Sequence, residues 1–104
     1  MSEVEKTVKK TVKKVIGEVL GIKKESLSEN SHLTADLGAD EYDYSEIVLR
    51  LEDSLGIIIP DQICEKCFSI RSPGATVGNI IQQIESLVEK LILEEASKPQ
   101  PRHP

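Results

Sequence analysis

The residues of this chain whose types could do chemistry are a cluster of acids, a pair of cysteines and two lone histidines. The acids form the largest group. Residues 25–65 hold eleven acidic residues against Arg50 alone, a net charge of −10, whereas residues 1–24 carry +4. A field of one sign steers basic partners toward it and repels nucleic acid. Acids can also simply keep a surface soluble, but here they gather at one expected helix start, which favours a docking face.

The cysteines, Cys64 and Cys67, form the second group, in the sequence Cys-Glu-Lys-Cys. A structural zinc site needs four ligands, and neither His32 nor His103 stands at a metal-site spacing from this pair. No strand is expected before the pair, so a thioredoxin-type motif is not favoured. We interpret the cysteines as small half-buried apolar residues on one helix face, with a redox disulfide or a zinc bridge between two chains as alternatives. We interpret His32 as a surface residue rather than a ligand.

The sequence offers no constellation for catalysis, because no histidine accompanies a nucleophile and neither a phosphate-binding loop nor a metal cluster is visible. We therefore do not expect an enzyme. Aromatic residues are 3% of the chain, too few for a surface that stacks single-stranded nucleic acid. No apolar run approaches the roughly 20 residues of a membrane span. The lysine-rich N-terminus lacks a signal-peptide core, so we expect a cytoplasmic location, with an organelle matrix as the alternative.

The spacing of apolar residues indicates which helices position these residues. Apolar residues recur at steps of three and four in four stretches, which are residues 2–20, 41–55, 61–67 and 77–95. They predict an all-α domain over residues 1–95, with Asp61 and Thr76 as the caps of the last two helices. The lysines of the first helix are interpreted as its solvated outer face rather than as a membrane-binding surface. Three prolines near the C-terminus predict a disordered tail over residues 96–104.

The acidic cluster lies at the head of the second of these helices. Asp40 is a suitable N-cap, because its carboxylate can accept a hydrogen bond from a first-turn N–H group. Glu41 and Asp43 follow in the first turn, where the helix dipole favours negative charge. Gly56 is expected to end the helix and Pro60 to prevent its resuming. The apolar stripe of this helix consists of Tyr44, Ile47, Val48, Leu51 and Leu55.

Two loops flank the middle of the chain. The loop over residues 24–39 is polar, with three leucines that we expect to pin it to the core, and a loop this long is uncommon unless it is functional. The segment Phe68–Ala75 contains the turn signal Ser-Pro-Gly. We expect Phe68 and Ile70 to cover the bundle and the tip at residues 71–74 to be mobile.

Several of these motifs resemble the acyl carrier protein family. They are Asp36-Leu37-Gly38-Ala39-Asp40, the acidic helix that follows, and Gly56-Ile57 with Ile59-Pro60-Asp61. The resemblance implies a four-helix bundle of acyl-carrier-protein type with a short third helix, working in fatty-acid, polyketide or related acyl metabolism. Carriers of this family have Asp-Ser-Leu at the head of this helix, and the serine holds the phosphopantetheine arm. This chain reads Asp40-Glu41-Tyr42 there. Compared with the family pattern, about seven residues are inserted at Phe68–Ala75.

Glutamate has no hydroxyl to which the arm could be attached, so we expect the 4'-phosphopantetheine site to be lost at Glu41 and no cofactor to be bound. The resemblance then implies a monomeric, non-carrying interaction module that docks on a basic patch of an acyl-metabolism enzyme. The predicted partner-binding residues are Asp40, Glu41, Asp43, Glu46, Leu49 and Asp53. The alternative is a functional acyl carrier with an unconventional attachment residue such as Ser45, one helical turn further on.

Overall fold

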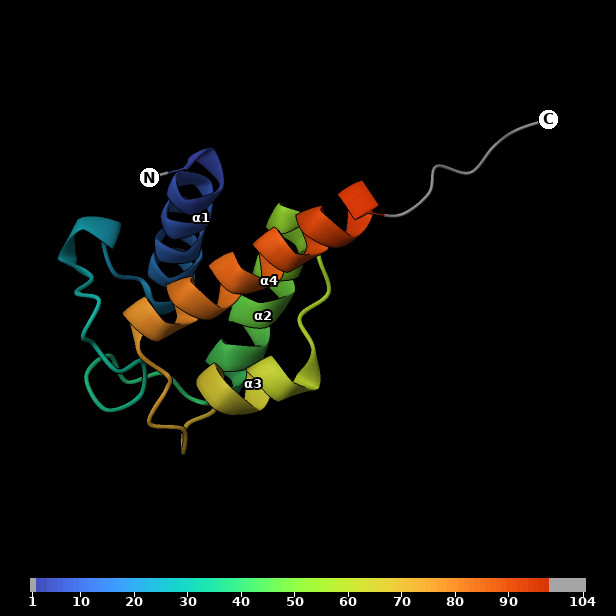
Figure 1. Ribbon diagram of the computed structural model, residues 1–104. Coiled ribbons are helices and arrows are strands. Elements are labelled where there is room, and N and C mark those ends of the chain that lie inside the picture. Colours follow the sequence, from blue (N-terminus) through green and yellow to red (C-terminus); the bar gives the residue numbers. More distant parts are fainter. Residues whose placement is uncertain (1, 98–104) are drawn as a thin grey trace.

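The computed structural model describes residues 2–97, and in this range the chain folds into four α-helices and one short 3-10 helix (Figure 1). The α-helices are α1 (Glu3–Leu20), α2 (Glu41–Leu55), α3 (Asp61–Cys67) and α4 (Val77–Ser97), and the 3-10 helix η1 spans Lys24–Ser26. The predicted all-α bundle with a short third helix is confirmed. The helix α4 runs two residues past the predicted domain end at residue 95. The rest of the predicted tail, residues 98–104, lies outside the described residues.

Local sequence explains most of the helix boundaries. Ser2 caps α1 by accepting a hydrogen bond from the Glu5 N–H at 3.1 Å. Gly56 ends α2 in the left-handed conformation, with φ 65°, which glycine adopts without steric penalty. The prediction that Asp61 caps α3 is wrong, because Pro60 occupies the cap position and Asp61 is the first helical residue. Its charge still lies where the helix dipole favours an anion.

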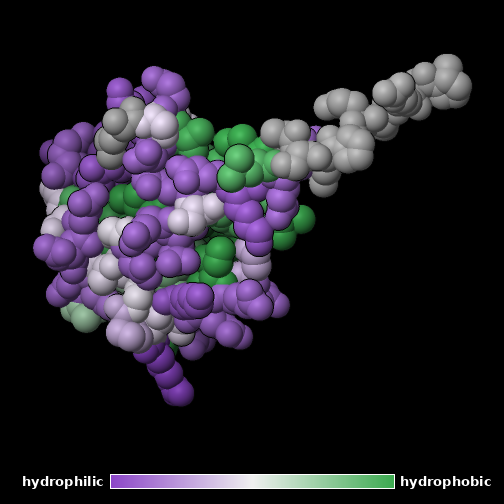
Figure 2. Space-filling view, viewed as in Figure 1, coloured by the Kyte–Doolittle hydropathy of each residue, from purple (hydrophilic) through white to green (hydrophobic). Residues whose placement is uncertain are grey.

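The core forms where α1 packs against both α2 and α4, while α3 contacts α4 less extensively. Its largest fully buried side chains include Ile16, Leu33, Ile47, Leu51, Ile80 and Ile84. Burying an aliphatic side chain of this size contributes about 1.5–3 kcal/mol. Within the predicted stripe of α2, Val48 and Leu55 are only half-buried. Figure 2 shows that hydrophilic residues cover most of one face and that hydrophobic atoms gather toward the end of α4, where Leu93 is exposed.

The long loop after α1 is joined to the start of α4 by backbone hydrogen bonds. The Leu33 N–H donates to the Ala75 carbonyl at 2.9 Å, and the Val77 N–H donates to the Ser31 carbonyl at 3.0 Å. A third bond runs from the Gly78 N–H to the Glu29 carbonyl at 2.8 Å. We call these paired segments, residues 29–33 and 75–78, the clamp.

His32 extends the clamp toward the segment Phe68–Ala75. Its Nδ1 accepts hydrogen bonds from the backbone N–H groups of Thr34, at 3.1 Å, and Ala35, at 3.0 Å. Because Nδ1 is an acceptor, Nε2 carries the hydrogen and donates it to the Ser72 carbonyl at 2.8 Å. His32 was predicted to be a surface residue rather than a ligand; it is half-buried, and its side chain joins two loops, a role that the sequence did not indicate. The mobility expected at residues 71–74 stays a prediction.

Candidate functional site at the head of α2

Two acidic residues at the start of α2 each bind the backbone N–H group of the other. The Asp40 carboxylate accepts a hydrogen bond from the Asp43 N–H at 2.8 Å, and the Asp43 carboxylate accepts one from the Asp40 N–H at 3.0 Å. This reciprocal arrangement is a capping box. It confirms Asp40 as the N-cap and gives Asp43 a role in the cap that its position in the first turn did not reveal. Both carboxylates therefore help to hold the helix start.

Glu41 lies between these two acids and takes no part in the cap. Its side chain is exposed and forms no hydrogen bond or ion pair within residues 2–97. In the same range, no protein group accepts a hydrogen bond from the backbone N–H groups of Glu41 and Tyr42. These groups carry the positive end of the helix dipole. The carboxylate of Glu41 is thus a solvent-facing anion at a positive helix end.

Ser45 lies one turn further on the same face. It is exposed, and its hydroxyl donates to the Glu41 carbonyl at 3.2 Å, in the usual manner of a helical serine. Four residues of helical rise separate it from Glu41 by about 6 Å along the axis. An enzyme that recognises the start of α2 would therefore contact Glu41 before it reached the Ser45 hydroxyl.

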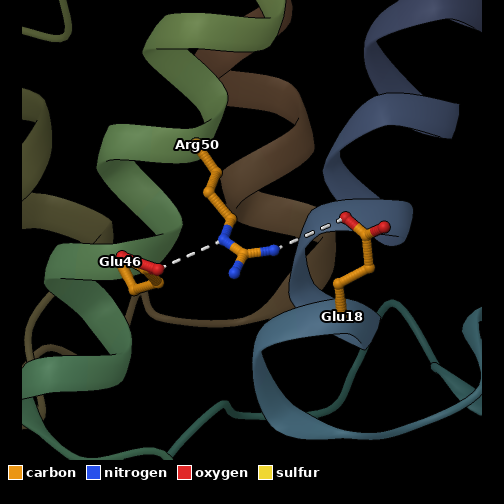
Figure 3. A network of polar contacts seen from close by, with 3 residues as sticks. All are labelled: Glu18, Glu46 and Arg50. Carbon is orange, nitrogen blue, oxygen red and sulfur yellow. Dashed lines mark hydrogen bonds and ion pairs between the residues drawn. The ribbon is translucent and has the colours of Figure 1, made fainter.

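The remaining predicted partner-binding residues lie along the exposed side of α2. Leu49 is 61% exposed. Asp53 is also exposed. Glu46 pairs with Arg50 at 3.3 Å, and Arg50 reaches Glu18 of α1 at 3.9 Å (Figure 3). Sequence reasoning noted Arg50 as a cation in an acidic helix but missed its contact with Glu18.

A cleft of about 510 Å³ opens between α2 and α3, directly beside Glu41. Its lining consists of Glu41, Tyr44, Ser45, Val48, Leu49, Cys64, Phe68, Ser69 and Ile70. Glu41 is the one charged residue in this lining. Phe68 is buried, as expected of a residue that covers the bundle, whereas Ile70 is 36% exposed at the cleft. The sequence did not predict the cleft, because its far wall depends on where the Phe68–Ala75 segment folds.

Tyr44 ties the head of α2 to the preceding loop. The Thr34 hydroxyl donates to the Ala39 carbonyl at 2.9 Å and therefore accepts from the Tyr44 hydroxyl, which lies 2.8 Å away. Burial raises the pKa of the Tyr44 phenol, and the hydrogen bonds with Thr34 offset part of this rise. The phenol consequently stays protonated at neutral pH, and its hydrogen bond with Thr34 supports the bond from Thr34 to Ala39, next to the cap residue Asp40.

The two cysteines of α3 have different surroundings. Cys64 is half-buried in the wall of the cleft, and Cys67 is fully buried with its thiol 3.2 Å from the Ile63 carbonyl. Burial raises the pKa of Cys67 to about 12. Burial, then the nearby Asp61, Glu52 and Glu65 carboxylates, raise the pKa of Cys64. The part of the chain that the structure describes contains no cluster of three potential metal ligands. The full burial of Cys67 fits a packing group, and the role of Cys64 stays a prediction.

None of the helices within residues 2–97 combines the length and hydrophobicity that crossing a membrane requires.

Comparisons with known proteins agree on one family. The family model described as "Phosphopantetheine attachment site" matches residues 10–78. An acyl carrier protein of Chloroherpeton thalassium is 36% identical over 70 residues, covering 67% of this chain and 75% of that protein. An acyl carrier protein of Wolinella succinogenes is 39% identical over 65 residues, which cover 62% of this chain and 76% of that protein. An acyl carrier protein of Cyanidium caldarium is 34% identical over 71 residues, which cover 68% of this chain and 71% of that protein. The family match contains the whole of α2 and its head.

Proposed function

Because the chain belongs to the acyl carrier protein family, we propose that it is a member that carries no acyl arm and acts as a protein-interaction module in acyl metabolism. Proteins of this family serve enzymes and are not enzymes themselves. One observation carries the proposal. The residue after the cap Asp40, where the family resemblance expects a serine, is Glu41, and its side chain points to solvent rather than into the core.

Attachment of the arm requires a hydroxyl oxygen that forms a phosphodiester bond. The Glu41 carboxylate cannot form this bond, so we propose that the 4'-phosphopantetheine site has been lost. The carboxylate instead puts a permanent anion close to where the phosphate of an arm would lie. The helix dipole stabilises such an anion by about 0.3–1 kcal/mol. The same dipole also makes glutamate a good first-turn residue, so mimicry of a loaded carrier is one part of the proposal rather than its basis.

The docking surface that we propose is the exposed side of α2. Glu41, Glu46 and Asp53 supply negative charge there, and Asp40 and Asp43 add charge at the capped end. Leu49 supplies an exposed apolar side chain among them. Opposite charges mainly set the rate and orientation of encounter, whereas a desolvated apolar anchor slows dissociation. The expected partner is a basic patch on an enzyme of acyl metabolism, met by a monomer of this chain in the cytoplasm.

Intact-mass measurement tests the loss of the arm. After incubation with coenzyme A and a broad-specificity phosphopantetheinyl transferase, the natural chain should gain no mass. The double variant Glu41→Ser with Tyr42→Leu should gain the mass of one arm, because the acidic helix that the transferase would read is retained. Both substituted side chains are exposed, so the fold should tolerate the change.

The variant Ser45→Ala serves as the control for the alternative attachment site. Placed in the double variant, it should leave loading intact. If the natural chain gained an arm and Ser45→Ala abolished that gain, the chain would be a carrier with an unconventional attachment residue, and the proposed function would be wrong.

A further inference from the structure

Arg50 is the single basic residue in the acidic stretch 25–65, and its guanidinium lies between two carboxylates. Its Nε is 3.3 Å from Oε1 of Glu46 on α2, and its Nη1 is 3.9 Å from Oε1 of Glu18 on α1. Figure 3 shows the side chain reaching from α2 toward α1 with Glu46 on one side and Glu18 on the other. The guanidinium therefore contacts acids of two different helices at once.

The pair within α2 has a favourable geometry. Glutamate four residues before a basic residue is the better order for such a pair in a helix. The planar guanidinium can also bind two carboxylates in fixed directions, which a lysine ammonium cannot do equally well. The three side chains are about half exposed, at 46% for Arg50 and 49% for each glutamate. An exposed pair contributes at most about 1 kcal/mol, so a partner protein can compete with it.

This network divides the acids of the docking surface into two groups. Glu46 already has a cationic partner, whereas neither Glu41 nor Asp53 forms an ion pair within the described range, residues 2–97. Asp40, Glu41 and Asp43 lie together at the head of α2, whereas Asp53 lies near its other end, so an incoming cation is attracted more strongly to the head than to the middle of the helix. A shallow groove between α1 and α2 adjoins this point, and both Leu49 and Arg50 line it.

We propose that Arg50 is a specificity-determining residue of the docking surface. It competes with the partner for Glu46 and so directs the basic side chains of that partner to the head of α2, at Glu41. The proposal rests on the proposed function. The partner that fits is an enzyme whose basic residues are concentrated at one point opposite Glu41. A partner whose basic residues are spaced along two turns of α2 would have to displace Arg50 and would bind more weakly.

The first test uses a defined cation, hexalysine, and backbone NMR titration of the chain. In the natural protein, the shift changes should be largest at Glu41–Asp43. In Arg50→Gln they should extend to Glu46 and Leu49, and affinity should rise about two- to fivefold, the range expected of exposed ion pairs. Equal footprints in the natural protein and in Arg50→Gln would overturn the proposal.

Lys90→Gln is the matched control for net charge. Lys90 pairs with Glu94 four residues on, at 4.0 Å, on the exposed side of α4. This variant removes the same charge as Arg50→Gln, but it should leave the footprint on α2 unchanged. If it widened the footprint as Arg50→Gln does, net charge alone would explain the effect and the proposal would fail.

A double-mutant cycle provides a second readout. Glu46→Gln should change hexalysine affinity little in the natural protein, because Arg50 already occupies that carboxylate. In Arg50→Gln the same substitution should cancel the two- to fivefold gain. If the effects of Glu46→Gln and Arg50→Gln on hexalysine affinity simply added, the Glu46 carboxylate would already be available to the peptide in the natural protein. That result would overturn the proposal.

Loading kinetics separate this proposal from the function on which it rests. In the variant with Glu41→Ser and Tyr42→Leu, adding Arg50→Gln should raise the transferase kcat/KM about two- to fivefold through KM, and the gain should disappear at high salt. A faster kcat at unchanged KM would contradict a docking role. If the double variant did not load at all, the proposed docking surface would fail, while the hexalysine footprints would still decide the role of Arg50.

Discussion

The helices α2 and α4 both begin after a loop, but their first N–H groups are satisfied in different ways. At α4, the clamp supplies carbonyls from Glu29 and Ser31, and the Thr76 hydroxyl accepts from the N–H of Asn79 at 3.2 Å. At α2, the cap residue Asp40 binds the N–H of Asp43, and the two N–H groups between them face solvent. One helix start is closed by the protein itself, and the other is open.

The two helix starts differ in how much each contributes to the stability of this small domain. Closing the start of α4 joins the long loop to the core through buried side chains such as Leu33. The start of α2 is held by exposed Asp40, half-buried Asp43 and one buried tyrosine, Tyr44, and the side chain of its first residue, Glu41, is exposed at the edge of the cleft. Substitution at Glu41 should therefore cost little stability. This explains how a carrier fold could keep its structure with a glutamate at this position.

The largest expected effect comes from breaking the closed start. Leu33→Ala should lower the free energy of unfolding by about 2–5 kcal/mol, because Leu33 is 0% exposed and the truncation leaves a cavity beneath the clamp. Urea denaturation measures the loss. The matched control on the open side is Leu49→Ala, which should cost less than about 0.5 kcal/mol. Equal losses of stability in Leu33→Ala and Leu49→Ala would contradict the described difference between the clamp at the start of α4 and the exposed side of α2.

The buried thiol of α3, Cys67, makes the stability of the core depend on pH in the alkaline range. The pKa of Cys67 is raised from 9.0 to about 12 in the folded state, so the unfolded chain loses this proton first as the pH rises. Stability due to Cys67 should be complete below pH 9 and should fall by up to about 1.4 kcal/mol per pH unit toward pH 12. Urea denaturation between pH 8.5 and about 10.5 measures the slope, and Cys67→Ala should make it shallower. An unchanged slope would contradict the burial argument.

Reaction with a thiol reagent sharpens the same contrast. In the folded protein Cys64, at the cleft, should react first, whereas Cys67 should react only after unfolding. In the variant Cys64→Ser, the remaining thiol should thus be protected in buffer and reactive in urea. Rapid modification of Cys67 in the folded chain would show that this part of the core opens readily.

The smallest effects are expected at the caps. Asp40→Ala and Thr76→Ala should each cost about 1 kcal/mol, the usual value for an N-cap. Amide hydrogen exchange should distinguish them. Asp40→Ala should speed exchange at Asp43, while Thr76→Ala should affect Asn79 and leave Val77 protected by the clamp. Faster exchange at Val77 in Thr76→Ala would show that the clamp depends on the cap.

Helix positions and two of the three predicted N-caps, Asp40 and Thr76 but not Asp61, could be predicted from sequence because they depend on residues within one or two turns. The stripe through Ile47 and Leu51 and the cap Asp40 are examples, and each was found where the pattern placed it. The contacts of His32 with Ser72 and of Arg50 with Glu18 could not be predicted. They join residues about 30 to 40 positions apart and arise only after α1, α2 and the two loops pack. The cleft was missed for the same reason.

The hydrogen bond between Leu33 and Ala75 also has a topological consequence. The chain leaves the clamp after residue 33 and returns to it at residue 75, so α2, α3 and the segment after them form one excursion with its two ends pinned together. The length of such an excursion can change without altering the distance between its ends. Lengthening a loop costs little, because closure entropy grows only with the logarithm of loop length. Extra residues near the exposed Arg71, between the buried Phe68 and Ala75, can therefore be accommodated while the two ends stay joined, and this point is the natural place to insert a reporter sequence.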